Sequence, residues 1–271
     1  MKGKNYYIPN VLSIAGSDPS GGAGIQADLK SFSANKTFGM SVITALTAQN
    51  TMGVQDIHLV PEDFIESQIN SIFQDIIVDA VKIGMMANSS IASIISKNLR
   101  KRKIKNIVID PVMVAKGGAT LLEKDAIEII RKDLIQIADV LTPNLPEAAL
   151  LTNTDIATTK SEMLTQGRRL LDLGAKAIYV KGGHLNSKNS PDLLITINDE
   201  IWYEAPRIKT INTHGTGCTL SSAICANLAH GFEIETAISN SKQYVTDAIK
   251  NADKLNVGQG HGPTHHFNNL W

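Results

Sequence analysis

The chain has 271 residues, and its 26 lysines and arginines balance its 26 aspartates and glutamates, so the formal net charge is zero. This length can bury a large core, and a single α/β domain of this size is ordinary. The neutral balance argues against a nucleic-acid partner or a membrane surface, and no apolar run approaches the length of a membrane span.

Short apolar runs alternate with helical patterns along the chain. The predicted strands are 11–15, 41–48, 57–60, 80–83, 106–110, 138–142, 177–180, 193–197 and 201–203. The predicted helices cover about 25–32, 61–74, 89–101, 123–134, 160–173 and 234–255, and two more begin near Pro146 and Gly217. Repeated strand–helix–strand units imply one domain over 1–271, with a mostly parallel sheet and helices on both faces.

The cysteines and the chain start bear on the cellular compartment. Cys218 and Cys225 are seven residues apart on one predicted helix, where they cannot pair with each other. The first seven residues contain no apolar signal region. We therefore expect a reduced, cytoplasmic protein.

Polar and glycine residues follow the predicted strands at the point where each strand ends. In open α/β sheets, ligands bind outside the carboxyl ends of the strands. Six positions lie there: 16–18, Gln49, Asp110, Asn144 with Glu147, Lys181, and 215–218. Their coincidence favours one binding site at this edge of the sheet over six unrelated turns.

The stretch 212–223 supplies two glycines, Gly215 and Gly217, at the start of a helix that then carries Cys218. A helix N-terminus has free N–H groups and a partial positive charge, and glycines let the backbone close on a phosphate. The same N–H groups favour a thiolate, so Cys218 is expected to have a lowered pKa. The alternative is a glycine-rich turn before a core helix with a buried cysteine.

The residues at the strand ends match metal-assisted phosphoryl transfer, which depends on positioning and charge neutralisation. Asp110 and Glu147 are candidates for holding Mg²⁺, directly or through water. Lys181 could hold a nucleotide phosphate, and Cys218 could act as the base, with His214 as the rival. Singly, Asp110 could also be a turn cap, Glu147 a solvated helix-start acid, and Lys181 a strand-end lysine that reaches solvent.

Eight motifs keep their order along nearly the whole chain, at 15–30, 41–50, 82–85, 110–113, 142–148, 181–184, 212–220 and 258–267. Through them the chain resembles the hydroxymethylpyrimidine/phosphomethylpyrimidine kinases of thiamine biosynthesis, in the ribokinase-like superfamily. The resemblance implies a ribokinase-like three-layer αβα sandwich with a mostly parallel central sheet, and a homodimer. It also implies ATP-dependent phosphorylation of 4-amino-5-hydroxymethyl-2-methylpyrimidine, and then of its monophosphate, with Mg²⁺.

The resemblance also assigns residue roles. Cys218 stands where the family has its base, Gly215 and Gly217 match the anion hole, and Asp110 and Glu147 match the metal-side acids. The implied nucleotide contacts are Lys181, Gly183, Asn144 and Thr216. The implied substrate pocket consists of Gly16, Ala23, Asp28, Gln49, Met85 and Val112.

Two features of this assignment are open at the sequence level. Gln49 can pair through its amide with a ring nitrogen and the adjacent amino group, which pyridoxal lacks. Gln49 thus favours the pyrimidine over pyridoxal as substrate. The alternative functions are a pyridoxal kinase of the same superfamily and a non-catalytic pyrimidine-binding protein. The glycines at 16–24 and 117–118 are suitable hinges for a closing loop.

The C-terminal tail contains His261, His265 and His266, whose spacing matches no closed zinc set. A structural metal is not expected there. The resemblance instead implies a tail that closes the fold.

Overall fold

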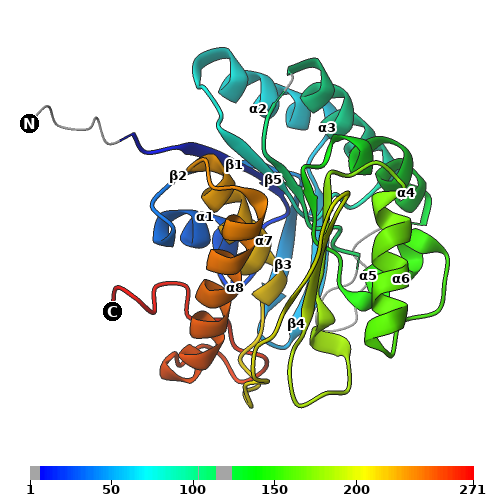
Figure 1. Ribbon diagram of the computed structural model, residues 1–271. Coiled ribbons are helices and arrows are strands. Elements are labelled where there is room, and N and C mark those ends of the chain that lie inside the picture. Colours follow the sequence, from blue (N-terminus) through cyan, green and yellow to red (C-terminus); the bar gives the residue numbers. More distant parts are fainter. Residues whose placement is uncertain (1–6, 103, 114–123) are drawn as a thin grey trace, which may run out of the picture.

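The computed structural model describes residues 7–102, 104–113 and 124–271. Its centre is an eight-stranded sheet in the order β10-β9-β8-β7-β6-β5-β1-β2 (Figure 1). The six strands β8, β7, β6, β5, β1 and β2 pair in parallel, each with its neighbour in this order. The strands β9 and β10 are antiparallel additions at one edge. The strands are β1 (Asn10–Ala15), β2 (Phe38–Ile43), β5 (Ala80–Ile83), β6 (Ile107–Ile109), β7 (Val140–Leu141), β8 (Ala177–Val180), β9 (Asp192–Thr196) and β10 (Glu200–Tyr203).

Helices cover both faces of this sheet (Figure 1). One hydrophobic cluster contains buried residues of α2 (Glu62–Asp75), α3 (Ser89–Arg102), α4 (Lys124–Ile129), α5 (Leu145–Thr152) and α6 (Lys160–Leu171). The other contains those of α1 (Gly24–Ala34), α7 (Thr216–Ala229) and α8 (Ile234–Lys250). Along β1, Leu12 and Ile14 join the first cluster and Val11 the second, as strand alternation requires. The predicted three-layer sandwich is confirmed.

The helix α7 lies at the centre of its layer. Its residues from Thr219 to Leu228 are all buried, because α1 and α8 flank it and the sheet lies beneath it. By contrast, α8 buries one stripe at helical spacing, which is typical of an outer helix. None of the helices in the described ranges is long and apolar enough to cross a bilayer.

The predicted strand at 41–48 is wrong, because the chain leaves the main sheet at Thr44. This buried residue donates its N–H to the carbonyl of Ala15 and its hydroxyl to the carbonyl of Met85. Its own carbonyl accepts the N–H of Val60. The chain continues as a separate antiparallel ribbon, β3 (Ala45–Asn50) and β4 (Gly53–Leu59). The pattern of β-branched residues runs through the break, so it does not reveal it.

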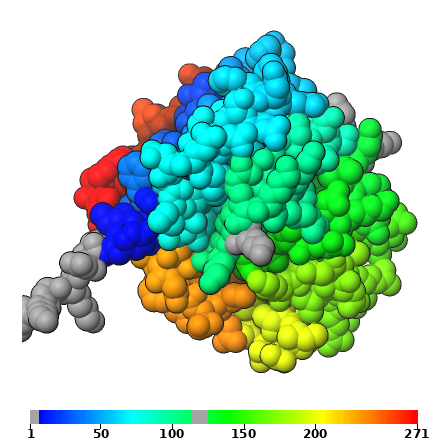
Figure 2. Space-filling model, turned by 90° about the horizontal axis from the view of Figure 1, so that it is seen from above, coloured from blue at the N-terminus to red at the C-terminus, as the bar shows by residue number. Residues whose placement is uncertain are grey.

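Two helix ends also differ from the prediction. The segment predicted as one helix at 123–134 continues from α4 as a π-turn over Ile130–Leu134 and a 3₁₀ turn over Ile135–Ile137. The last helix ends at Lys250, and a 3₁₀ turn follows over Ala252–Lys254. The start of the described chain and the C-terminal segment lie on the same side of the molecule (Figures 1 and 2).

A buried ion pair connects the centre of the sheet to α1. Lys82, in the middle of β5, donates to both carboxylate oxygens of Asp28 in α1 at 2.8 Å, and neither residue is exposed. Ser13 of β1 and Ser222 of α7 donate to the same carboxylate at 2.6 and 2.7 Å. Burial is the largest influence and lowers the pKa of Lys82, but nearby negative charges, foremost that of Asp28, and the hydrogen bond to Asp28 together outweigh it, so the pKa rises.

We expect Lys82→Met to destabilise the protein by about 3–5 kcal/mol, because it leaves a buried carboxylate without its cation. Urea unfolding followed by circular dichroism measures the loss. The double variant Lys82→Met/Asp28→Asn should recover most of it, since no unpaired charge is left. A single variant as stable as the wild type contradicts this account.

Candidate active site

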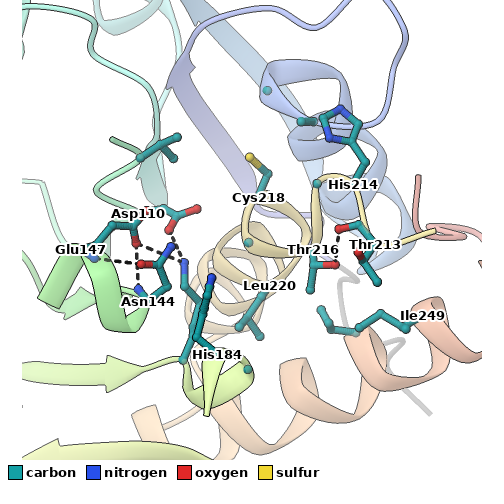
Figure 3. Close-up of a pocket in the computed structure, with 18 of the residues that line it drawn as sticks. Asp110, Asn144, Glu147, His184, Thr213, His214, Thr216, Cys218, Leu220 and Ile249 are labelled. Atoms are coloured by element: carbon teal, nitrogen blue, oxygen red, sulfur yellow. Dashed lines mark hydrogen bonds and ion pairs between the residues drawn. The ribbon is translucent and has the colours of Figure 1, made fainter. Parts of the chain in front are cut away.

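A cavity of about 810 Å³ opens at the carboxyl ends of the parallel strands. Residues at or after the ends of β1, β5, β6, β7 and β8 line it, together with the first turn of α7, one side of α8 and two residues of β3. Figure 3 shows side chains converging on it from these elements. Except for Asp28, every predicted site residue lines it: Gly16, Ala23, Gln49, Met85, Asp110, Val112, Asn144, Glu147, Lys181, Gly183, Gly215, Thr216, Gly217 and Cys218.

The N-terminus of α7 faces this cavity. Its N-cap is Gly215, with φ of 73°, and a Cβ there would overlap the carbonyl oxygen of Gly22. Glycine therefore lets the loop between β1 and α1 press directly against the start of α7. The free N–H groups of the first turn and the helix dipole can bind an anion such as a phosphate.

Cys218 lies in this first helical turn, and its sulfur points away from α7 into the cavity (Figure 3). The expected lowered pKa is wrong. Burial raises the pKa of the thiol to about 11, and the carboxylates of Asp28 and Asp110 add to this effect. The charge of Lys82 and the N–H of Gly24 act in the opposite direction but do not outweigh burial. At neutral pH the partly buried thiol of Cys218 is therefore mostly protonated.

An acid–lysine cluster lies beside the first turn of α7 (Figure 3). The ammonium nitrogen of Lys181 lies 2.7 Å from Asp110 Oδ1 and 3.8 Å from Glu147 Oε2. Thr142 and Ser221 donate to the two oxygens of Asp110 at 3.3 and 3.4 Å. Lys181 is thus paired within the site and does not extend into solvent, and Asp110 is more than a turn cap.

Glu147 is held in place by a capping box at the start of α5. Its backbone N–H donates to Asn144 Oδ1 at 2.9 Å, and its carboxylate accepts the N–H of Asn144 at 2.8 Å. Only 5% of Glu147 is exposed, so it is not a solvated acid. Burial and the nearby charge of Asp110 raise its pKa to about 7, although Lys181 lowers it.

The carboxylates of Asp110 and Glu147 fit a magnesium ion. Mg²⁺ prefers oxygen ligands and keeps several waters, so one or two acids beside a phosphate site are sufficient. A cation there would also keep Glu147 ionised near neutral pH, because a metal ligand must be deprotonated.

The other end of the cavity contains an amide, an acid and an imidazole. His214 Nε2 lies 2.7 Å from Asp18 Oδ2 and 3.3 Å from Gln49 Nε2. Burial alone would raise the pKa of Asp18, but hydrogen bonds from His214, Ser20 and Ala23 lower it to about 2. His214 therefore connects the loop before α7 to an ionised carboxylate in the loop after β1.

Comparison with known proteins agrees with this geometry. A family model described as phosphomethylpyrimidine kinase matches residues 18–265. The chain belongs to this family.

Relatives and solved structures extend the match over the chain. The hydroxymethylpyrimidine/phosphomethylpyrimidine kinase of Salmonella typhimurium is 48% identical over 262 residues, covering 97% of this chain and 98% of that protein. The phosphomethylpyrimidine kinase structure from Clostridium difficile is 46% identical with a TM-score of 0.79, covering 89% of this chain and 99% of the other. An ADP complex of Bacillus subtilis pyridoxal kinase is 37% identical with a TM-score of 0.89, covering 96% and 98%.

The placement of Asp28 in the substrate pocket needs correction. Asp28 is fully buried and does not line the cavity, because its carboxylate is taken up by Lys82, Ser13 and Ser222. Lys82 does line the cavity. A lysine inside an otherwise apolar strand must find a buried partner, and this signal indicates from the sequence that Lys82 is paired, although not with which acid.

Other residues of the cavity were also not assigned from the sequence. Asp18 belongs to the glycine-rich loop, and its strand-end position was noted without a role. Lys242 of α8 pairs with Asp192 at 2.6 Å, and both line the cavity. They have no strand-end signal, because Asp192 begins an antiparallel strand and Lys242 lies in mid-helix. The hinge predicted at 117–118 lies outside the described residues.

The raised pKa of Cys218 predicts slow alkylation at neutral pH. In a Cys225→Ala background, the rate with iodoacetamide should rise about tenfold per pH unit between pH 7.5 and 10, because only the thiolate reacts. Mass spectrometry of quenched samples measures the rate, with Cys218→Ala as the blank. A plateau below pH 8 would show that the thiol is already ionised there.

Proposed function

We propose that the protein transfers the γ-phosphoryl group of ATP to the hydroxymethyl group of 4-amino-5-hydroxymethyl-2-methylpyrimidine, and then to the resulting monophosphate. The observation that carries the proposal is the shared cavity, which is lined both by Gln49 and by the first turn of α7, Asp110 and Lys181. The family membership and the relatives' names support the substrate. The ADP complex of the Bacillus subtilis relative supports ATP as the donor.

At the acceptor end, Gln49 presents one carbonyl and one NH₂ group. These can pair with the exocyclic amino group and the adjacent ring nitrogen of an aminopyrimidine. Met85 packs beside Gly16 in the same wall, where a Cβ on the glycine would lie 2.9 Å from the sulfur. This flat, apolar contact suits an aromatic ring, and Val112 and Ala23 line the same cavity.

At the donor end, the first turn of α7 can bind the transferred phosphoryl group through its N–H groups. Gly217 adjoins the acid–lysine cluster, because a Cβ on it would lie 3.4 Å from both Asp110 Oδ2 and Lys181 Nζ. Asn144, Gly183 and Thr216 line the same end and are the proposed nucleotide contacts. Mg²⁺, held by Asp110 and Glu147, would neutralise phosphate charge when bound.

The acceptor hydroxyl would lie beside the sulfur of Cys218. Phosphoryl transfer passes through a loose transition state in which positioning and electrostatics dominate. A thiol that is mostly neutral can therefore serve by orienting the hydroxyl, and its thiolate fraction can accept the proton.

The direct test is turnover by the purified protein with Mg²⁺-ATP. The aminopyrimidine should give a higher kcat/KM than pyridoxal, and ³¹P NMR should detect the monophosphate and then the diphosphate. A higher kcat/KM for pyridoxal would make this a pyridoxal kinase. No ADP release by folded protein that binds the pyrimidine would make it a binding protein.

Replacing Cys218 should affect the chemical step far more than binding. We expect Cys218→Ala to lower kcat about 100-fold or more, the size typical of a lost general base, with pyrimidine affinity within a few-fold of the wild type. Steady-state kinetics and calorimetry separate the two quantities, and Cys218→Ser is the isosteric control. Unchanged turnover would transfer the base role to His214 or water.

Replacing Gln49 should affect binding of one substrate only. Gln49→Leu should weaken pyrimidine binding by about 2–3 kcal/mol, because a buried polar pair is lost, and should leave ATP affinity nearly unchanged. Isothermal titration with each ligand measures both. Equal loss for the two ligands would place Gln49 outside the acceptor site.

We also propose that the protein acts in the cytoplasm as a homodimer. The family resemblance supports the dimer, and the two free cysteines support a reducing compartment. Sedimentation velocity at micromolar concentration tests the dimer.

A further inference from the structure

The segment 258–266, here called the C-terminal strap, is bonded to the tip of the β3–β4 ribbon. The carbonyl of Thr51, at the ribbon's turn, accepts the N–H of His261 at 2.9 Å, and its hydroxyl accepts the N–H of Gly260 at 3.1 Å. A Cβ on Gly260 would overlap the carbonyl oxygen of Thr51. The two backbones are therefore in direct contact, and Thr51 itself is buried.

The same strap is bonded to the loop before α7. His214 donates its N–H to Gly262 at 3.0 Å, and its carbonyl accepts the N–H of Thr264 at 3.3 Å. Gly262 in turn donates to the side chain of Asn212 at 3.1 Å. These bonds pair the strap with the segment that leads directly into Gly215 and Cys218.

Beyond this loop the strap is anchored in the helical layer. His265 donates its N–H to the carbonyl of Ala248 in α8 at 3.0 Å. The side chain of His266 contacts the hydroxyl of Thr219 at 3.1 Å, one residue after Cys218. The strap is therefore anchored in the helical layer at its C-terminal end, and its N-terminal end contacts the ribbon.

The strap holds the tip of the ribbon, whose base is hydrogen-bonded to Ser17 through Ala45 and Thr47. The ribbon is a two-stranded sheet separate from the main one, and an isolated hairpin of two strands is only marginally stable. Along β3, Thr47 and Gln49 face the cavity, whereas Leu46, Ala48 and Asn50 are exposed. The pairing shifts at Ala48 and Gln49, and such irregularities change the direction in which a side chain points.

We propose that Thr51 is a positioning residue, which works with the C-terminal strap to hold Gln49 at a fixed place relative to the first turn of α7. The inference rests on the proposed function, since it gives Gln49 an acceptor to align. The strap is hydrogen-bonded both to the turn of the ribbon at Thr51 and to His214, which lies directly before the first turn of α7. Loosening the strap at Thr51 therefore displaces the amide of Gln49 and leaves the acid–lysine cluster in place.

The test compares Thr51→Val with Thr51→Ser and with Thr196→Val. Thr51→Val keeps the side-chain shape but removes the acceptor for Gly260, whereas Thr51→Ser retains it. Thr196 is the matched control, because its hydroxyl accepts the N–H groups of Asn198 and Asp199 in the β9–β10 turn, away from the cavity. Steady-state kinetics for pyrimidine and ATP, pyrimidine titration and thermal melting are measured for all variants.

We expect Thr51→Val to raise the KM and Kd of the pyrimidine about three- to tenfold, with the KM of ATP within twofold. Thr51→Ser should keep the wild-type values. Thr196→Val should change neither KM, and any effect of it should be limited to a lower melting temperature. Gly260→Ala, which forces the two backbones apart, should give a larger rise in pyrimidine KM.

Three results would overturn the inference: an unchanged pyrimidine KM in both Thr51→Val and Gly260→Ala, an equal rise for pyrimidine and ATP, or the same rise in Thr196→Val. Hydrogen exchange separates this failure from failure of the proposed function. If the wild type does not phosphorylate the pyrimidine, exchange of the ribbon amides 45–59 still decides the matter. Faster exchange of these amides in Thr51→Val supports the inference that the strap anchors the ribbon, and unchanged exchange overturns it.

Discussion

The buried carboxylate of Asp28 connects the elements whose ends form the floor of the cavity. It accepts hydrogen bonds from Ser13 of β1, Lys82 of β5 and Ser222 of α7. Ser222 lies four residues after Cys218, hence one helical turn below it on the same face of α7. The position of the thiol relative to the sheet therefore follows from this one cluster, and the site inherits its rigidity from the core.

Several charged groups of the cavity lie beside groups of opposite charge. Lys181 balances Asp110 and part of Glu147, His214 contacts Asp18, and the thiol of Cys218 is neutral. The free N–H groups at the start of α7 are then available to an incoming phosphate. In the proposed complex the nucleotide adds anionic oxygens near Lys181, and the proposed Mg²⁺ at Asp110 and Glu147 would offset them.

Much of the fold and most of the site could be predicted from the sequence, because both follow from local signals. Apolar runs that end at Asp110 or Lys181 show where parallel strands finish, and the topology then gathers those ends at one edge. The break at Thr44 could not be found this way, since it depends on bonds to Ala15 and Met85 that only the folded chain provides.

Burial explains the two site predictions that need correction. The helix N-terminus at Cys218 is a local signal, but the desolvation that raises its pKa depends on everything packed around it. Asp28 likewise lies in a motif of the family, yet its partner Lys82 is 54 residues away. Local sequence patterns identify the positions of these two residues, but they do not reveal the burial and the distant partners that set each residue's charge and role.

The separation of the β3–β4 ribbon from the main sheet has an evolutionary consequence. Gln49, which would recognise the amino group of the heterocycle, sits on an appendage, while the residues that would handle the phosphates sit on the strand ends and α7. Substitutions on the ribbon would thus change contacts to the heterocycle while the proposed transfer machinery stays in place. Enzymes with different nutrient specificities can then diverge from one ancestral scaffold.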